Sequence, residues 1–443
     1  MRDSKLSSPT KLRSWALVLL AFGNGASIYR EPKDVPVEDF TQALKALGVD
    51  TPGPYLAPKV VLSGDTEKIV TATLREAVSN LIKAKNPQLI VFVLPAANTV
   101  VYNCIKKVCD LDYGVHNVNL VAQNMQKNGK PYYANVGLKV NLKLGGINQL
   151  IEAKELGIIA KGKTMLVGID VTHPSPGSSS NAPSVAGMVA SIDSSLAQWP
   201  AELRVQAGRK EMVTELDSML KAHLRRWARN NMNALPENII VYRDGVSEGQ
   251  YDLVVKEELT RLKEACKQTY PASDTEKGLP RISVVIVGKR HHTRFYPTKD
   301  SDRTGNPNNG TVVDRGVTEA RNWEFYLQAH SALHGTARPA HYFTVWDEIF
   351  RNEKAKAPYQ NAADVLENLT HHLCYLYGRA TKAVSICPPA YYADLVCTRA
   401  RCYLSHVFDP ADTASSSSAP AATAVGNNTV TLHENLRETM FYI

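Results

Sequence analysis

Residues 166–177 read LVGIDVTHPSPG, an apolar run that ends in Asp170, and residues 239–250 read IIVYRDGVSEGQ, a second run that ends in Asp244. Short apolar runs of this kind, bounded by turn-forming residues, predict buried β-strands. Between the two runs, apolar residues at helical spacing predict a helix over residues 211–228. Strands that alternate with helices predict an α/β fold, and the alternation over residues 15–161 in particular predicts helices packed on a mostly parallel sheet.

The same alternation extends along the chain in both directions from this region. A polar break at residues 160–164 (AKGKT) divides it, and a helix is predicted to open with a capping box between Ser247 and Gln250. Further elements are expected as strands at 15–22, 89–94, 165–169, 184–192, 239–242 and 282–287, and as a helix at 67–84. Two domains follow, over residues 13–162 and 163–443, with a polar linker remnant at 1–12, a loop at 300–310 and a disordered loop at 411–428.

Composition narrows the class of protein. Lys and Arg number 51 against 43 Asp and Glu, and the formal net charge of +8 favours a polyanionic partner. Hydrophobic residues make up 44% of the chain, enough for a buried core. The seven cysteines contain no C-x-x-C pair, so we expect a reducing compartment rather than a disulfide scaffold or a cysteine zinc site. The run at 15–22 is too short to cross a bilayer, and we expect no membrane partner.

Half of the net charge lies in residues 103–147, where six lysines stand against two aspartates. Tyr102 and Lys106 are four residues apart on a predicted helix, so they share one face. Lys139 and Lys143 are also four apart, in LKVNLKLGG, whose alternation favours a strand and whose paired glycines favour the end of a helix. Either structure places both ammonium groups on one side, where a phosphate would relieve their repulsion and Tyr102 could stack on a base. The alternative is a solvated lysine face.

Asp170 and Asp244 both stand at predicted strand ends. In open α/β sheets, sites form beyond the carboxyl ends of strands, so the two carboxylates are placed to face one another. The alternative is that each is a turn former or a helix cap. A converging pair would need a cation, and an oxygen-only ligand set favours Mg²⁺ or Mn²⁺ over zinc. Two such ions could activate a water and stabilise the leaving oxygen in phosphodiester cleavage.

The histidines do not predict a zinc site. His291 and His292 lie in the basic string KRHHTRFYP at residues 289–297, and no further ligand stands at metal-binding spacing. A cationic loop that faces phosphate is the favoured interpretation. His173 is expected in a turn or in support of a neighbouring ligand.

Five strings, in this order along the chain, resemble the PIWI domain of a eukaryotic Argonaute: GIDVTHPSPG, RVQAGRKE, YRDGVSEGQ, GKRHHTRFYP and PPAYYADLVCTRAR. The preceding strings VVYNCIKK and LKVNLKLGG resemble the Mid domain of the same family. The resemblance covers essentially the whole chain, and a filamentous-fungal Argonaute of the quelling type is one candidate for its origin. It implies a Rossmann-like Mid domain over residues 13–162 that binds the guide 5′ end, and an RNase H-like PIWI domain over residues 163–443.

By motif match, the resemblance assigns four catalytic residues: Asp170, Glu211, Asp244 and Asp394. Glu211, in RVQAGRKE, matches the glutamate that family members insert to complete the site. Many animal relatives have a histidine where this chain has Asp394, and a carboxylate there also suits a hard metal ion. The implied cofactors are two divalent ions, Mg²⁺ or Mn²⁺, held by Asp170, Asp244 and Asp394.

The resemblance also implies a pocket for the guide 5′-phosphate, made of Tyr102, Lys106, Lys139, Lys143 and Arg399, with Arg399 from the second domain. Such cationic and donor groups suit charge-assisted recognition of a terminal phosphate. A glutamine of the family pocket has no clear counterpart here, and Asn117 and Asn119 are candidate substitutes. The loop at 95–101 is expected to face the first guide base.

The leading hypothesis is a small-RNA-guided endoribonuclease that anchors a 5′-phosphorylated guide and cleaves complementary target RNA by two-metal hydrolysis. It would act in cytoplasmic RNA silencing together with silencing-complex proteins. The family's amino-terminal and PAZ domains have no counterpart here, so the chain is expected to be the Mid–PIWI lobe alone. A second hypothesis is a guide-RNA-binding silencing module with little or no cleavage in this truncated form. A third, an unrelated RNase H-like nuclease or transposase, would show no preference for a 5′-phosphorylated guide.

Overall fold

The computed structural model describes residues 5–23, 27–176, 178, 182–275, 278–352, 354–408 and 430–443. Contacts divide the chain into two compact units. The first unit comprises Met1–Gln149, Pro174–Ala182 and Thr398–Ile443, and the second comprises Leu150–His173 and Pro183–Cys397. The first unit therefore combines the amino-terminal segment up to Gln149 with the carboxyl-terminal segment from Thr398. The expected disordered loop at 411–428 lies outside the described residues.

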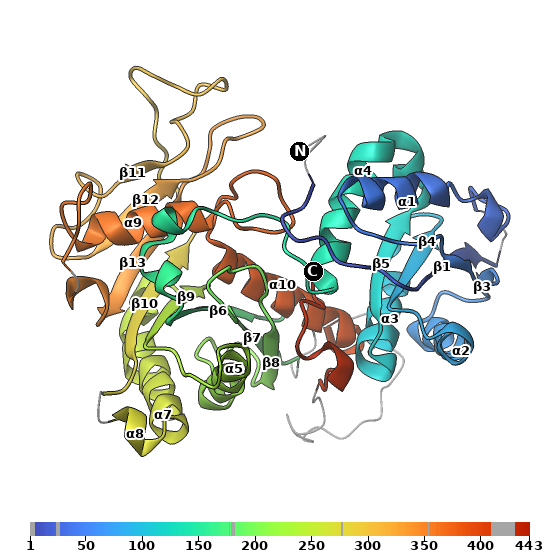
Figure 1. The fold of residues 1–443 in the computed structure, drawn as a ribbon, viewed down its shortest axis with the longest axis horizontal. Helices are drawn as coiled ribbons and strands as arrows, with labels where there is room; N and C mark the ends of the chain where they lie inside the picture. The colour runs from blue at the N-terminus through green and yellow to red at the C-terminus, as the bar shows by residue number, and fades with distance from the viewer. Residues whose placement is uncertain are drawn as a thin grey trace. The chain divides into compact units, whose positions relative to one another are not determined.

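The first unit is built on a parallel sheet with helices on both faces (Figure 1). Its strands are β1 (Trp15–Phe22), β2 (Tyr55–Leu56), β3 (Val60–Leu62), β4 (Leu89–Leu94) and β5 (His116–Val121). Their order is β2–β1–β4–β5, and β3 also pairs with β1. The helices are α1 (Val37–Ala46), α2 (Glu67–Lys85), α3 (Thr99–Lys107), α4 (Ala122–Lys143) and α11 (Ser405–Phe408).

The strands predicted at 15–22 and 89–94 and the helix predicted at 67–84 are confirmed. β4 is buried along its whole length because Leu89, Val91 and Val93 pack toward α1 and α4, whereas Ile90 and Phe92 pack toward α2 and α3. A strand covered on both faces has no polar side, which is why its sequence reads as an unbroken apolar run.

The structure decides between the two alternatives for one segment and differs from the prediction for another. The string LKVNLKLGG is helical: it lies in α4, which ends at Lys143, and the positive φ of +86° at Gly145 starts the following turn. Leu6 and Leu12, in the segment expected to be a linker, are buried in the core beside α1 and α4. The described part of that segment therefore packs on the first unit.

The second unit is built on an eight-stranded sheet in the order β11–β12–β13–β10–β9–β6–β7–β8. The strands are β6 (Thr164–Thr172), β7 (Ser184–Ala190), β8 (Ala201–Gln206), β9 (Asn238–Asp244), β10 (Arg281–Gly288), β11 (Thr311–Val313), β12 (Glu324–Gln328) and β13 (Ala340–Asp347). The helices are α5 (Leu216–Asn230), α6 (Tyr251–Leu253), α7 (Leu259–Thr269), α8 (Ala272–Thr275), α9 (Ala362–Leu373) and α10 (Pro388–Tyr403). The last residues of α10, from Thr398, belong to the first unit.

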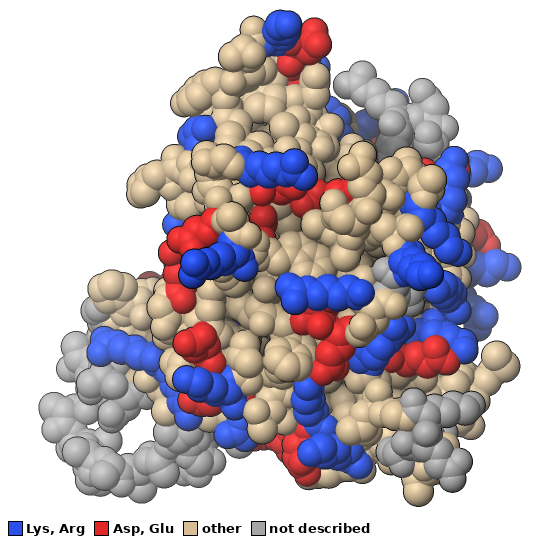
Figure 2. All heavy atoms as spheres, turned by 90° about the vertical axis from the view of Figure 1, so that its left-hand side faces the viewer, with Lys and Arg blue, Asp and Glu red and all other residues tan. Residues whose placement is uncertain are grey.

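The α/β class is confirmed, and the mostly parallel sheet predicted from residues 15–161 is the sheet of the first unit. The sheet of the second unit is mixed. Only the pairs β6–β9 and β9–β10 are parallel, and the other pairs of this sheet are antiparallel. On the face seen in Figure 2, Lys and Arg side chains are interspersed with Asp and Glu. Among the described residues, no helix combines the length and the apolar character that a membrane span requires.

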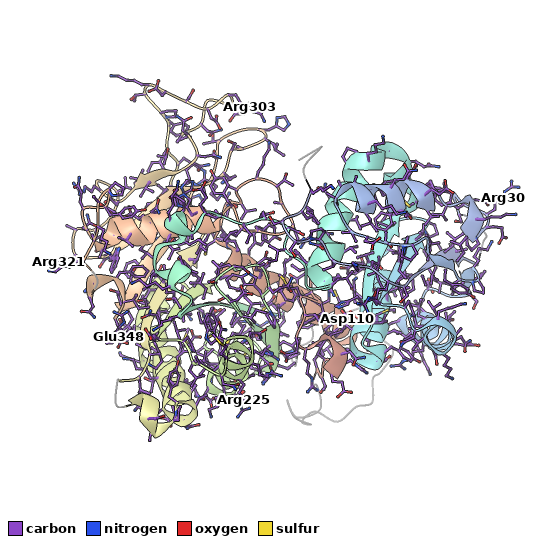
Figure 3. All side chains as sticks on the ribbon, viewed as in Figure 1. Arg30, Asp110, Arg225, Arg303, Arg321 and Glu348 are labelled. Atoms are coloured by element: carbon purple, nitrogen blue, oxygen red, sulfur yellow. The ribbon has the colours of Figure 1, made fainter. Side chains whose placement is uncertain are left out.

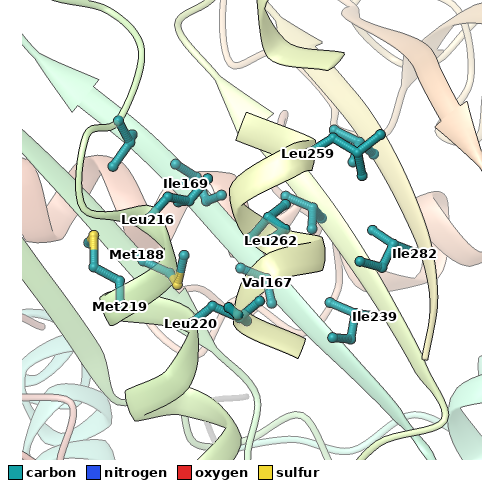
Figure 4. Close-up of a cluster of buried hydrophobic side chains, with 14 of the residues drawn as sticks. Val167, Ile169, Met188, Leu216, Met219, Leu220, Ile239, Leu259, Leu262 and Ile282 are labelled. Atoms are coloured by element: carbon teal, nitrogen blue, oxygen red, sulfur yellow. The ribbon is translucent and has the colours of Figure 1, made fainter. Parts of the chain in front are cut away.

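The core of the second unit decides where its aspartates point. Val167 and Ile169 of β6 and Ile239 of β9 pack against Leu220 of α5 and Leu262 of α7 (Figure 4). Successive side chains of a strand point to opposite faces of the sheet. Asp170 and Asp244 therefore project from the opposite face, where α9 and α10 pack.

Candidate functional site

The first candidate site lies where α10 crosses the end of β6. A Cβ at Gly168 would stand 2.0 Å from the carbonyl oxygen of Pro389, so only glycine lets the helix lie this close to the strand. The thiol of Cys397 donates a hydrogen bond to the carbonyl oxygen of Asp170 at 3.3 Å. This close packing brings Asp394, on the same helix, to the end of β6 that carries Asp170.

The carboxylates of Asp244 and Asp394 lie close enough to Asp170 to act on its ionisation, and Asp394 acts on that of Asp244. Burial, followed by the charge of Asp244, raises the pKa of Asp170 to about 7. Burial also raises the pKa of Asp244 to about 6, with a further contribution from Asp394, although the N–H of Gly245 donates to Asp244 Oδ1 at 2.7 Å. Burial raises the pKa of Asp394 as well. Carboxylates that disfavour one another's charge in this way form a place where a cation is favoured.

Glu211 reaches the same place from a loop. The helix predicted over 211–228 begins only at Leu216, so Glu211 precedes it. Its Oε1 accepts a hydrogen bond from Nη2 of Arg243 at 2.9 Å, and its Oε2 lies 2.7 Å from Nε2 of His173. A Cβ at Gly245 would stand 3.1 Å from Oδ1 of Asp170 and 3.6 Å from Oε1 of Glu211, so the two carboxylates border the same point.

Arg243 and Glu258 hold this loop and were missed in the sequence. Arg243 is fully buried, and its Nε donates to Oε2 of Glu258 at 2.9 Å. Oε1 of Glu258 accepts from the backbone N–H of Val213 at 3.0 Å. The sequence does contain a feature that predicts this ion pair, because an arginine inside the apolar run IIVYRD requires a buried acidic partner. His173, whose Nδ1 lies 2.7 Å from Oγ of Ser184, supports Glu211 as the sequence suggested.

Oxygen donors of this kind suit Mg²⁺ or Mn²⁺. In the described ranges, no three His, Cys, Asp or Glu side chains already stand in an arrangement that could hold a metal ion. The structure therefore brings Asp170, Asp244, Asp394 and Glu211 into one neighbourhood without assembling a finished coordination sphere. The repulsion among the aspartates is the property that fits a cation there.

The second candidate site is a group of buried cations in the first unit. Lys106 of α3, Lys143 of α4 and Arg399 of α10 are each at most 4% exposed. Asp110 lies among them: its Oδ2 accepts from Nη1 of Arg399 at 2.7 Å, and its Oδ1 accepts from Nδ2 of Asn117 at 2.8 Å. We call these five residues the cationic cup. With three cations and one carboxylate, the cup has a net charge of +2 when all are ionised.

The remaining hydrogen bonds of the cup reach the carboxyl-terminal segment. Lys143 donates to the carbonyl oxygen of Phe441, and Arg399 donates to the same oxygen at 2.9 Å and to that of Tyr442 at 3.2 Å. Lys106 donates to Oδ1 of Asn117. These bonds explain why residues at both ends of the first unit are needed to build the cup.

The charges in the cup are poorly compensated. Burial, followed by repulsion from Arg399, lowers the pKa of Lys106 to about 7. Burial lowers the pKa of Lys143 well below its ordinary value, and Arg399 and Lys106 lower it further. Burial acts to raise the pKa of Asp110, yet the neighbouring cations, Arg399 first, bring that pKa below its usual range. An anion in the cup would relieve this repulsion.

The other residues predicted for this site lie at its edge. The Lys106 ammonium lies 5.2 Å from the centroid of the Tyr102 ring, and Tyr102 is 36% exposed. Lys139 is half-buried one turn before Lys143, and its charge contributes to lowering the pKa of Lys143. Asn117 is part of the cup, whereas both polar side-chain atoms of Asn119 are buried without a hydrogen-bond partner among the described residues.

Comparison with known proteins gives one consistent result. The family model described as the Piwi domain matches residues 89–405. Protein argonaute 5 of Arabidopsis thaliana is 36% identical in an alignment that covers 83% of this chain and 38% of that protein. Protein argonaute 1B of Oryza sativa subsp. japonica is 32% identical in an alignment that covers 100% of this chain and 41% of that protein. The chain thus spans about two fifths of the length of these relatives.

Solved structures agree with the sequence comparison. The C-terminal lobe of a budding yeast Argonaute superposes with a TM-score of 0.84 at 27% identity, covering 99% of this chain and 87% of that one. The Mid–PIWI domains of N. crassa QDE-2 give a TM-score of 0.68 at 33% identity, covering 99% of this chain and 100% of that one. Kluyveromyces polysporus Argonaute, solved with a guide RNA, gives 0.81 at 28% identity over 98% of this chain and 51% of that one. The chain therefore belongs to the Argonaute family, and it has the Rossmann-like and RNase H-like α/β fold of a eukaryotic Mid–PIWI lobe.

Proposed function

We propose that this chain is the part of a small-RNA-guided ribonuclease that anchors the 5′-phosphate of a guide RNA and cleaves complementary target RNA. The observation that carries the proposal is the gathering of Asp170, Asp244, Asp394 and Glu211 at one end of the second sheet. The similar Kluyveromyces polysporus Argonaute was solved with a guide RNA, which supports guide binding by this chain. In this proposal residues 13–162 act as the Mid domain and residues 163–443 as the PIWI domain.

In this proposal the cationic cup binds the 5′-phosphate of the guide. Lys106, Lys143 and Arg399 would donate charge-assisted hydrogen bonds to the terminal phosphate, and binding an anion would restore the lowered pKa of Lys106. The half-exposed ring of Tyr102 would stack on the first base. Lys139, at the edge of the cup, would add to the attraction for the phosphate.

In this proposal the acidic side chains of the second unit carry out cleavage of the target RNA. Asp170, Asp244 and Asp394 would hold divalent ions, Mg²⁺ or Mn²⁺, which when bound supply an activated water and stabilise the leaving oxygen. Glu211 is held by Arg243 and His173 beside Asp170 and completes the acidic set. Because the aspartates have raised pKa values in the free protein, a bound cation would displace their protons.

The test is guide-directed cleavage of a complementary RNA in the presence of Mg²⁺. The wild-type chain loaded with a 5′-phosphorylated guide is expected to give one product pair, and Asp244→Asn is expected to give none above background. Equal cleavage by the variant would reject the assignment of the acidic site. Cytoplasmic action and binding of silencing-complex proteins remain expectations of the same proposal.

A second function is favoured by one observation. The acidic side chains are not already arranged to hold a metal among the described residues. The alternative is a guide-RNA-binding module with little or no cleavage. Tight binding of 5′-phosphorylated RNA, with no product at any Mg²⁺ or Mn²⁺ concentration, would favour this alternative.

A further inference from the structure

One acidic side chain, Asp110, accepts several of the hydrogen bonds of the cationic cup. Its place in the first unit is labelled in Figure 3. Asp110 is 1% exposed, and its carboxylate accepts three side-chain hydrogen bonds. The donors are Asn117 at 2.8 Å, Arg399 at 2.7 Å and the hydroxyl of Tyr403 at 2.7 Å. Of the three cations, Arg399 is bonded to this carboxylate directly, and Lys106 is linked to it through Asn117.

Asp110 determines which atoms of its neighbours face the inside of the cup. Since Nδ2 of Asn117 donates to Asp110, the amide must present its Oδ1 to Lys106. Arg399 uses Nη1 for both Asp110 and Phe441, so the rest of its guanidinium is aimed away from Asp110. The carboxylate therefore orients one amide and one guanidinium at the same time.

The cations of the cup have more donors than partners. Lys106 and Lys143 each make one hydrogen bond out of three possible, and Arg399 makes three out of five. Two N–H groups remain on each side chain in the described part of the chain. Buried N–H groups require acceptors, and a terminal phosphate offers three acceptor oxygens.

The charge of the cup matches one class of ligand. Three cations and one carboxylate leave +2 when all four are ionised, the state that a bound anion favours. A phosphate monoester carries about −1.5 to −2 at pH 7, whereas an internal phosphodiester or a sulfate monoester carries one negative charge. The charge of Asp110 offsets part of the repulsion among the three buried cations, and it acts to raise the pKa of both lysines.

We propose that Asp110 is a positioning residue, which orients Arg399 toward the ligand, holds Asn117 as an acceptor for Lys106, and sets the cup to a charge that selects a phosphate monoester over monoanionic ends. The proposal deepens the proposed function and rests on it. Under this proposal the charge of a phosphate monoester, and not only its shape, determines whether it binds in the cup.

The first experiment uses the wild-type chain and three RNAs of one sequence that end in a 5′-phosphate, a 5′-sulfate or a 5′-hydroxyl. Sulfate has the shape of the phosphate and lacks one charge. The phosphate is expected to bind at least about tenfold more tightly than the sulfate, the value of one charge-assisted hydrogen bond. Equal affinity for phosphate and sulfate would overturn the charge match. Equal affinity for phosphate and hydroxyl would instead reject guide anchoring itself.

The second experiment compares Asp110→Asn with Tyr403→Phe. Asp110→Asn is expected to weaken binding of the 5′-phosphate RNA by about ten- to a hundredfold and to leave the 5′-hydroxyl RNA within about twofold. Tyr403→Phe keeps the carboxylate on Arg399 and is expected to change phosphate affinity by less than about fivefold. Thermal melting checks that both variants fold.

Two results would overturn the positioning role. One is an Asp110→Asn chain that keeps the wild-type preference for phosphate. The other is an equal loss of affinity for the phosphate and hydroxyl RNAs, since a residue with a purely structural role would weaken both. If Asp110→Asn does not fold, the phosphate and sulfate comparison on the wild-type chain still decides whether the charge match holds.

Discussion

Asp170 and Asp347 each stand at the end of a β-strand, yet their carboxylates are held in opposite ways. Oδ1 of Asp347 accepts from the backbone N–H groups of Ile349 and Phe350, both at 3.1 Å, and Oδ2 accepts from that of Arg351 at 2.9 Å. Asp347 is thus a turn-forming aspartate. Asp170 instead lies beside two further carboxylates, and its pKa is raised to about 7. A strand that ends in aspartate has the same sequence pattern in both cases. The pattern does not show whether the aspartate lies beside backbone N–H groups or beside other carboxylates.

This difference predicts opposite changes in stability. Without divalent ions at pH 7.5, Asp170→Asn removes a charge from a repelling group and is expected to raise the free energy of unfolding by about 1–2 kcal/mol. Asp347→Asn removes acceptors from the turn and is expected to lower it by about 1–2 kcal/mol. Urea denaturation in the presence of a chelator measures both. A loss of stability in both variants would mean that Asp170 is an ordinary turn residue.

Lys106 predicts how guide affinity depends on pH. Its pKa is about 7 in the free protein, where it is faced by Arg399, Asp110, Cys109 and Cys402. A bound phosphate favours the charged ammonium, so the pKa of Lys106 is higher in the complex than in the free chain. Above pH 7 binding must therefore take up a proton, and affinity for the 5′-phosphate guide should fall as pH rises from 7 to 9.

The measurement is fluorescence anisotropy of a labelled guide across this pH range. The decrease is expected to approach about tenfold per pH unit for each proton taken up. A guide with a 5′-hydroxyl serves as the control, because its binding does not require the ammonium and should stay nearly constant. An affinity for the phosphate guide that does not change with pH would contradict the expected protonation of the cup.

At the scale of elements, the strands were predictable and the loops were not. β6, β7, β9 and β10 lie within a few residues of the predicted runs, because a strand buried on both faces has an apolar sequence. The segment before α5 repeats apolar residues at helical spacing and is nevertheless a loop. Nε2 of Gln206 donates to the carbonyl oxygens of Lys210 at 2.6 Å and Met212 at 3.2 Å, and such side-chain bonds leave no mark in the periodicity.

The order of the strands in the second sheet could not be predicted from the sequence either. The antiparallel partners of β6 and β10 are β7 and β13, and β13 begins at Ala340, far along the chain from Arg281. Hydrophobic runs tell which segments are buried strands and do not tell their neighbours. For the candidate acidic set, the motif resemblance supplied the residues, and only the fold shows that Gly168 lets α10 approach them.

The packing of α10 predicts a specific glycine requirement. Gly168→Ala would place a Cβ 2.0 Å from the backbone oxygen of Pro389, so the helix must move. We expect a loss of about 2–3 kcal/mol in the free energy of unfolding and a loss of cleavage at a temperature where the variant is folded. Gly288→Ala is the matched control in the same sheet, because nothing lies within 4 Å of its Cβ position. If both alanines are tolerated equally, close packing of α10 does not position Asp394.

At the scale of the whole molecule, the two candidate sites are built by different compact units. Asp170, Glu211, Asp244 and Asp394 belong to the second unit, and the cationic cup belongs to the first. The sequence interpretation assigned Arg399 to the second domain, yet contacts group it with the first unit. Its hydrogen bonds to Asp110, Phe441 and Tyr442 explain this grouping, since all three partners lie in the first unit.

Separate units predict that guide anchoring and cleavage can be changed independently. Lys143→Met keeps the volume of a buried side chain and removes one cation of the cup. It is expected to weaken 5′-phosphate guide binding by about ten- to a hundredfold and to make the salt slope of binding shallower by about one. At saturating guide, its cleavage rate should stay within about threefold of the wild type. Asp244→Asn is expected to show the converse, with guide affinity unchanged and no product.

The double variant provides the decisive comparison, because effects at sites without shared partners add within about 0.3–0.5 kcal/mol. Guide affinity of Lys143→Met combined with Asp244→Asn should therefore equal that of Lys143→Met alone. A larger deviation would show that the acidic site and the cup respond to one another, and α10 would be the first element to examine, since it carries Asp394 and Arg399 five residues apart. Additivity would instead mean that this helix supplies residues to two sites that work independently, so that a guide could be held as firmly by a chain that cannot cut as by one that can.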